Sequence, residues 1–133
     1  MDDIEVEITV ESDIVAARQA GREMARALGF GSADQTRLAT AISELARNVI
    51  RYAGEGFCLI SDESDDRERK VRVVVEDHGP GIPDIDAAIT DGFSTGGGLG
   101  AGLPGARRLV HEFHIESRPS LTRVSMVMRR RRL

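Results

Sequence analysis

Glu44 and Asn48 are two polar residues of the segment AISELARNVIRYA (residues 41–53) whose types and spacing suit a chemical role. They are four residues apart, so on a helix they lie on one face, at the edge of an apolar stripe. A carboxylate in that place can accept a proton, and an amide oxygen is a neutral ligand that Mg²⁺ takes alongside phosphates and water. The alternative is a solvated helix face on which Glu44 only pairs with Arg47. The segment by itself leaves both interpretations open.

Asp77 belongs to a second candidate segment, VVVEDHGPGIPD (residues 73–84). An apolar strand runs there into two glycines and two prolines, a pattern that predicts a sharp and fixed turn. Asp77 would lie at the mouth of the core, where a partly desolvated carboxylate needs donors. The exocyclic amine of a purine would serve, and so would backbone N–H groups of the turn. A turn without any ligand is the alternative.

Half of the 14 glycines lie between Gly92 and Gly105. The run GLGAGLP (residues 98–104) leads into a segment that looks helical. Glycines let the backbone approach a ligand, proline suits the first turn of a helix, and a helix N-terminus is a ready anion site. We therefore predict a mobile flap whose end binds phosphate. The alternative is a flexible linker, but we predict no second domain for it to join.

The elements that must position these residues are predicted from the spacing of apolar positions. Ser12 and the capping box that starts at Ser32 mark the starts of two helices. The order of elements favours an α+β fold, a two-layer sandwich with a mixed, mostly antiparallel sheet and helices on one face. The predicted strands are 4–10, 57–60, 71–75, 113–117 and 122–128, and the predicted helices are 12–28, 32–53 and 104–111.

The composition bounds the class of protein. The chain has 133 residues, 41% of them hydrophobic and 30% charged, and we expect one domain over residues 1–133. Without an apolar run of roughly 20 residues or a basic N-terminal segment, we expect a cytoplasmic protein that makes no membrane contact. Cys58, the single cysteine, is predicted to be a core residue.

Charge argues against a nucleic-acid partner. The formal net charge is −4 at pH 7, and nucleic-acid-binding domains usually carry a basic surface. The run of arginines at residues 129–132 is the exception. We interpret it as a solvated tail, or else as a docking patch for an acidic surface.

Rival chemical motifs fit less well. A P-loop and a protein-kinase signature both need a lysine in a defined place, and the only lysine, Lys70, lies in neither. The GxGxxG match at residues 100–105 does not follow a strand directly. His111 and His114 share a spacing that suits a metal, but no third ligand is apparent.

Taken together and in this order, the three segments resemble the GHKL (Bergerat-fold) ATP-binding family. Glu44 and Asn48 match its N box, the pattern from Asp77 to Gly81 matches its first glycine box, and residues 98–103 match its second. The stretches AISELARN, EDHGPGIPDI and DGFSTGGGLGAGLPG look like the RsbT-type switch serine/threonine kinases of the bacterial stressosome. This second likeness extends over nearly the whole chain.

The resemblance implies ATP and Mg²⁺ as cofactors and assigns roles at the matching positions. Asp77 would bind the adenine amino group, and Gly79 and Gly81 would shape the turn beneath the base. Asn48 would coordinate Mg²⁺. Glu44 would act as the base, or polariser, for the attacking hydroxyl.

The resemblance also implies an ATP lid over about residues 84–103. Thr122 matches a threonine on the strand that closes the adenine pocket. Two departures stand out: a Gly-x-Gly before that threonine is replaced by Pro-Ser-Leu (residues 119–121), and Arg51 looks more like the basic residue of histidine kinases. The lid residues that would wrap the phosphates are Gly98, Gly100, Ala101, Gly102 and Leu103.

The resemblance implies a function as well. Such a protein would use Mg-ATP to phosphorylate a STAS-domain antagonist or scaffold protein in a bacterial stress-signalling partner switch. On release it would bind and activate a PP2C-type phosphatase. Two alternatives remain, an anti-sigma-factor kinase and a mainly non-catalytic, nucleotide-dependent binding switch.

Overall fold

A computed structural model of the chain describes residues 1–82 and 102–132. Every predicted strand and helix is present, with ends that differ by a few residues. In chain order the elements are β1 (Ile4–Ile8), α1 (Glu11–Ala27), α2 (Ser32–Tyr52), β2 (Gly56–Asp62), β3 (Glu68–Asp77), α4 (Gly102–Leu109), β4 (Glu112–Arg118) and β5 (Leu121–Arg131).

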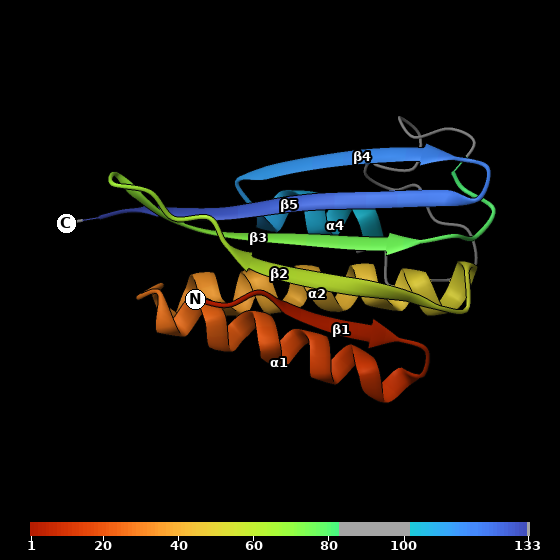
Figure 1. Cartoon of the computed structure of the whole chain (residues 1–133), viewed down its shortest axis with the longest axis horizontal. Helices are drawn as coiled ribbons and strands as arrows, with labels where there is room; N and C mark the ends of the chain where they lie inside the picture. The colour runs from red at the N-terminus through yellow and green to blue at the C-terminus, as the bar shows by residue number, and fades with distance from the viewer. Residues whose placement is uncertain (83–101, 133) are drawn as a thin grey trace.

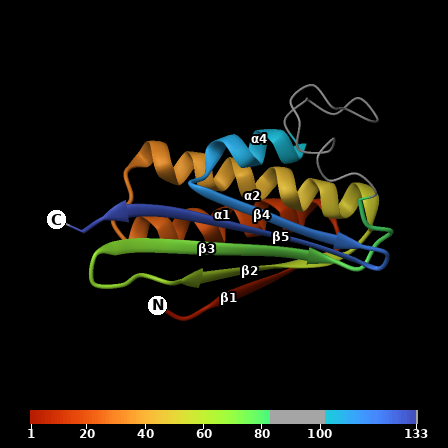
Figure 2. The ribbon, with the colours of Figure 1, turned by 90° about the horizontal axis from the view of Figure 1, so that it is seen from above.

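The strands form one sheet in the order β1-β2-β3-β5-β4. Helices α1, α2 and α4 lie together on one face of it, as Figures 1 and 2 show. The predicted α+β sandwich is therefore confirmed. Instead of the mixed sheet that we expected, all four pairings between the described strands are antiparallel.

The core lies between the sheet and the helices. Because strand side chains alternate between faces, every second residue points toward the helices, as Val71, Val73 and Val75 do on β3. On α2 the apolar stripe from Leu38 to Val49 is buried against them. Each fully buried leucine, isoleucine or valine contributes about 1.5–3 kcal/mol to folding. Cys58 is buried as predicted, and its burial raises the pKa of the thiol to about 12.

The starts of α1 and α2 differ from the predicted caps. Helix α1 begins at Glu11, before Ser12, and Asp13 Oδ2 accepts hydrogen bonds from the N–H groups of Thr9 and Val10 at 2.9 and 3.1 Å. Helix α2 begins at Ser32 itself and has no side-chain cap. The predicted capping box is therefore absent, because its serine is already helical.

The arginine run does not form a solvated tail as far as Arg131. Strand β5 continues to that residue, and its last three residues pair with the start of β3. Arg129 forms ion pairs with Glu112 at 2.8 Å and with Glu68 at 3.8 Å. Acidic partners on both neighbouring strands thus allow a basic segment to remain in the sheet.

Helix α4 begins at Gly102, two residues before the predicted start. Pro104 still falls in its first turn, where its missing N–H costs no hydrogen bond. The buried residues Leu103, Gly105 and Ala106 lie on this helix, which packs against α2 (Figure 2). In the described part of the chain, no helix is both long and apolar enough to cross a membrane.

Candidate functional site

Four residues from four strands form a row across one end of the sheet. Gly56 on β2 is opposite Asp77 on β3, Asp77 is opposite Thr122 on β5, and Thr122 is opposite Ser117 on β4. Opposite residues of antiparallel strands point to the same face. The row lies two positions beyond core residues such as Val75, so it faces the helices. Asp77 and Thr122, predicted from separate motifs, are brought together.

The C-terminal end of α2 packs on this end of the sheet, as Figure 1 shows at the arrowhead of β3. A Cβ at Gly56 would lie 2.8 Å from Cγ1 of Val49. A Cβ at Gly79 would lie 2.7 Å from the Cβ of Ala53. Real Cβ atoms do not approach so closely, so glycine at both positions is what allows this close packing.

Asp77 is half-buried at the end of β3. Its Oδ1 accepts a hydrogen bond of 2.9 Å from the N–H of Gly79. Burial raises the pKa of the Asp77 carboxyl above its ordinary value, and the Gly79 N–H opposes the rise. No described residue donates to Oδ2, so this oxygen can accept a hydrogen bond from a ligand.

The turn that follows Asp77 is held against the β4–β5 hairpin. Gly81 has a φ of +85°, and a Cβ on it would lie 2.5 Å from the carbonyl oxygen of Arg118. The N–H of Ile82 donates to Ser117 Oγ at 2.7 Å. Ser117 was not among the predicted site residues, because a serine in a predicted strand carries no signal until the register is known.

Glu44 lies on α2 with a side chain that is 13% exposed. Its Oε1 accepts from Arg47 Nη1 at 3.0 Å, and its Oε2 accepts from the N–H of Gly102 at 3.1 Å. The ion pair between Glu44 and Arg47 that a solvated helix face would explain therefore exists, but the same carboxylate also contacts the start of α4. Asn48, one turn further, is half-buried, and no described residue hydrogen-bonds its side chain.

Of the predicted lid residues, only the last two can be placed. Gly102 is the first residue of α4, and Leu103 has a buried side chain. The backbone of Leu103 is therefore the part available to a ligand. Gly98, Gly100 and Ala101 lie outside the described residues.

The two departures from the family pattern have structural explanations. In the β4–β5 turn, Ser120 takes a φ of +72°, a left-handed conformation in which glycine is more common. The hairpin thus closes without the Gly-x-Gly. Arg51 is exposed, with its guanidinium carbon 5.6 Å from the centre of the Tyr52 ring. No phosphate contact follows from that position.

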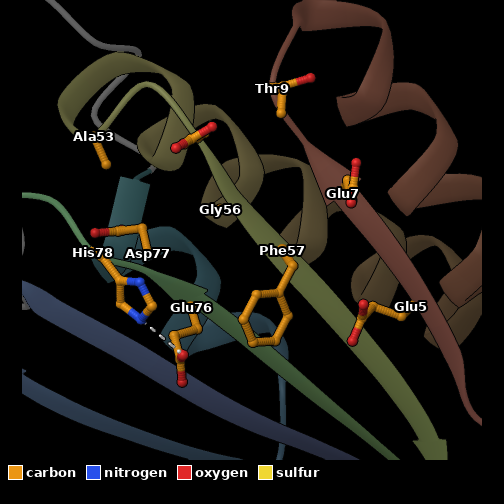
Figure 3. A pocket seen from close by; sticks show the side chains of 10 residues that line it. Glu5, Glu7, Thr9, Ala53, Gly56, Phe57, Glu76, Asp77 and His78 are labelled. Atoms are coloured by element: carbon orange, nitrogen blue, oxygen red, sulfur yellow. Dashed lines mark hydrogen bonds and ion pairs between the residues drawn. The ribbon is translucent and has the colours of Figure 1, made fainter.

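An acidic hollow lies mainly on the opposite face of the sheet and reaches round the end of the sheet, where Ala53 and Gly56 also line it. Glu5, Glu7 and Glu76 line it, and Figure 3 shows Phe57 between Glu5 and Glu76. Asp77 borders it as well. Carboxylates repel phosphate groups, so we do not assign a nucleotide to this hollow.

Comparison with known proteins identifies the family. The profile of the histidine kinase-, DNA gyrase B- and HSP90-like ATPases matches residues 33–132. The chain belongs to this ATPase family. It is also 56% identical over 112 residues to serine/threonine-protein kinase RsbT of Bacillus subtilis strain 168, which covers 84% of each chain. It therefore belongs among the RsbT-type kinases, and the predicted resemblance is confirmed.

Solved structures show the same fold. A Mycobacterium tuberculosis protein with RsbU and RsbW domains matches with a TM-score of 0.69 at 18% identity, over 100% of this chain and 34% of that one. The catalytic domain of histidine kinase ThkA matches with a TM-score of 0.54 at 24% identity, over 96% and 97% of the two chains. At these identities the likeness concerns the fold alone.

Proposed function

We propose that the chain is an ATP-dependent serine/threonine protein kinase of a partner-switching stress-signalling system, with its nucleotide between α2, the end of the sheet and the start of α4. The observation that supports this site is the double contact of α2. Its end touches Gly79 beside Asp77, while Glu44 binds Gly102. From Glu44 to Ala53 the helix rises about 13 Å, which is the scale of an extended nucleoside triphosphate.

The base would lie at the end of the sheet. Asp77 Oδ2 would accept a hydrogen bond from the exocyclic amine of adenine, and Thr122 on the neighbouring strand would contribute a hydroxyl beside it. The desolvation of Asp77 strengthens such a hydrogen bond, because water competes poorly there. Gly79 and Gly81 shape the turn beneath the base and hold the main chain close to it.

The phosphates would extend toward α4. The first N–H groups of α4 carry the positive end of the helix dipole, which attracts anions. The half-buried amide oxygen of Asn48 has no described partner and fits a magnesium ligand. A bound Mg²⁺ would neutralise charge on the phosphates. The glycines at 98 and 100, Ala101, Gly102 and Leu103 would wrap the phosphates through their backbone.

Glu44 would act as the base for the attacking hydroxyl. As the serine or threonine oxygen bonds to the γ-phosphorus, the bond from that phosphorus to the bridging oxygen breaks and ADP leaves. Glu44 takes the hydroxyl proton. Phosphoryl transfer depends mainly on positioning and charge neutralisation, so the fixed place of the carboxylate is what matters most.

The partners follow from the RsbT relationship rather than from geometry. We propose that the hydroxyl belongs to a STAS-domain antagonist or scaffold protein in the cytoplasm. After its release from that complex, the kinase would bind and activate a PP2C-type phosphatase.

The test is label transfer from γ-labelled ATP, with Mg²⁺, to a purified STAS-domain antagonist. We expect label on a serine or threonine of the partner, and its loss in Glu44→Gln with ATP binding retained. Glu23→Gln is the matched control, because Glu23 forms an i,i+3 pair with Arg26 at the same 3.0 Å as the pair of Glu44 with Arg47. Transfer by Glu44→Gln at the wild-type rate would exclude the base assignment.

Two other outcomes point to the alternative functions. ATP binding without transfer to any STAS-domain protein would favour the nucleotide-dependent binding switch. Transfer together with stable capture of a sigma factor would favour an anti-sigma-factor kinase.

A further inference from the structure

We propose that Ser117 is a positioning residue of the adenine pocket, whose hydroxyl ties the turn after β3 to the start of β5 and so sets Asp77 and Thr122 against the base. The inference rests on the proposed function, since it needs adenine beside Asp77. Ser117 matches none of the motifs that define the site and lies 40 residues from Asp77 in the chain.

The contacts of the Ser117 hydroxyl join three segments. Its oxygen accepts from the N–H of Ile82 at 2.7 Å, in the turn that follows Asp77. It lies 3.1 Å from the hydroxyl oxygen of Thr122 and donates to the carbonyl of Leu121 at 3.4 Å. One half-buried side chain on β4 thus links the glycine turn to the first two residues of β5.

These contacts use the whole hydrogen-bonding capacity of the hydroxyl, which has one donor and two acceptor sites. Either hydroxyl can donate between Ser117 and Thr122. When Ser117 donates to Leu121, it accepts from Ile82 and from Thr122, and all three contacts form at once. Ser117 then has no site left for a ligand and acts only through its neighbours. In that arrangement the proton of Thr122 points toward Ser117, and a lone pair of Thr122 is left for the pocket.

Packing makes the turn dependent on this anchor. A Cβ on Gly81 would lie 3.3 Å from Ser117 Oγ and 2.5 Å from the carbonyl oxygen of Arg118. The turn therefore rests directly on the end of β4. Without the hydroxyl, the part-buried N–H of Ile82 loses its acceptor, and an unpaired buried donor is expensive. The turn must then shift to find water, and Asp77, at the start of that turn, shifts with it.

The experiment measures the affinities for ATP and for inosine triphosphate, which lacks the exocyclic amine that Asp77 would bind. In Ser117→Ala we expect ATP affinity to fall about 5- to 50-fold, and affinity for inosine triphosphate to fall less. A general loss of structure would lower both affinities equally. The change in their ratio therefore separates positioning from a structural role.

Matched variants isolate the hydroxyl. Ser117→Thr keeps the hydroxyl and should retain the wild-type ratio of the two affinities. Valine has nearly the shape of threonine but no hydroxyl, so Ser117→Val should behave like Ser117→Ala. Ser125→Ala is the control, because Ser125 is a half-buried strand serine on the opposite face whose hydroxyl forms no hydrogen bond with a described residue. Unfolding temperatures without nucleotide identify any variant that fails to fold.

The outcomes separate the two hypotheses. If wild type prefers ATP and both Ser117→Ala and Ser117→Val keep that preference, the role of Ser117 is overturned while the proposed function stands. If wild type binds both nucleotides equally, the adenine assignment fails and the inference fails with it. If Ser117→Ala does not fold, the test is the rate of amide exchange at Ile82. This rate should be higher in Ser117→Val than in Ser117→Thr, and equal rates would show that the hydroxyl does not anchor the turn.

Discussion

The N–H of Gly102 donates a hydrogen bond of 3.1 Å to Oε2 of Glu44, and so joins the first residue of α4 to the middle of α2. Arg47 occupies the other carboxylate oxygen at 3.0 Å. The group that we propose as the base is thus held from two sides. Each carboxylate oxygen keeps a second lone pair, which can accept a hydrogen bond from a substrate hydroxyl while both of these bonds remain.

Removing this carboxylate should loosen the start of α4. In Glu44→Ala, amide exchange at Gly102 should accelerate, because the N–H loses its only described acceptor. A net hydrogen bond to a charged group contributes about 1.5–3 kcal/mol, which corresponds to roughly a 10- to 150-fold change in exchange. Glu23→Ala is the control. An unchanged Gly102 rate would show that the bond does not persist in solution.

Substitution at Asp77 should weaken nucleotide binding. Asp77→Asn retains an acceptor for the Gly79 N–H but replaces the charged acceptor for adenine. We expect ATP affinity to fall about 5- to 150-fold, as measured by calorimetry. Asp66→Asn, in the exposed β2–β3 turn, should have no effect. Wild-type affinity in Asp77→Asn would exclude the adenine assignment.

The same residue should make stability depend on pH. Burial raises the pKa of Asp77 in the folded chain, so the unfolded state releases this proton at a lower pH. The favourable contribution of Asp77 to the stability of the folded state is therefore complete below the pKa of Asp77 in the unfolded chain. It is lost as pH rises through the pKa of Asp77 in the folded chain. Without nucleotide, the unfolding temperature of Asp77→Asn relative to wild type should rise from pH 4 to pH 7. A constant difference over this range would contradict the raised pKa.

Gly81 and Gly54 offer a matched test of the turn. Both have a positive φ, but only Gly81 faces the carbonyl of Arg118, while a Cβ at Gly54 meets nothing within 4 Å. Alanine should cost about 1–2 kcal/mol at either position for its left-handed backbone, with a further steric cost only at Gly81. Thermal unfolding should show the larger loss in Gly81→Ala, and only this variant should lose ATP affinity. Equal losses would mean that the turn can move away from β4.

Much of the fold and the candidate residues Glu44, Asp77 and Gly102 were predictable because their signals are local. Apolar spacing revealed the helices and strands, and the residues around Glu44, Asp77 and Gly102 each form a compact motif. Local signals also misled. Arg129 to Arg131 looked like a tail because arginines resemble solvated sequence. Only the sheet shows that they pair with β3 and that Arg129 has acidic partners on β3 and β4.

The sequence by itself determined which segments are helix or strand and which residues are candidates for the chemistry, since periodicity and motif spacing depend on residues close in the chain. The tertiary structure decided which of those residues meet. Thr122 faces Asp77 because β5 pairs with β3 rather than only with its hairpin partner β4. Ser117 joins them through the register of that hairpin. A shift of one residue would turn both side chains to the opposite face, and strand register is a property of the assembled sheet.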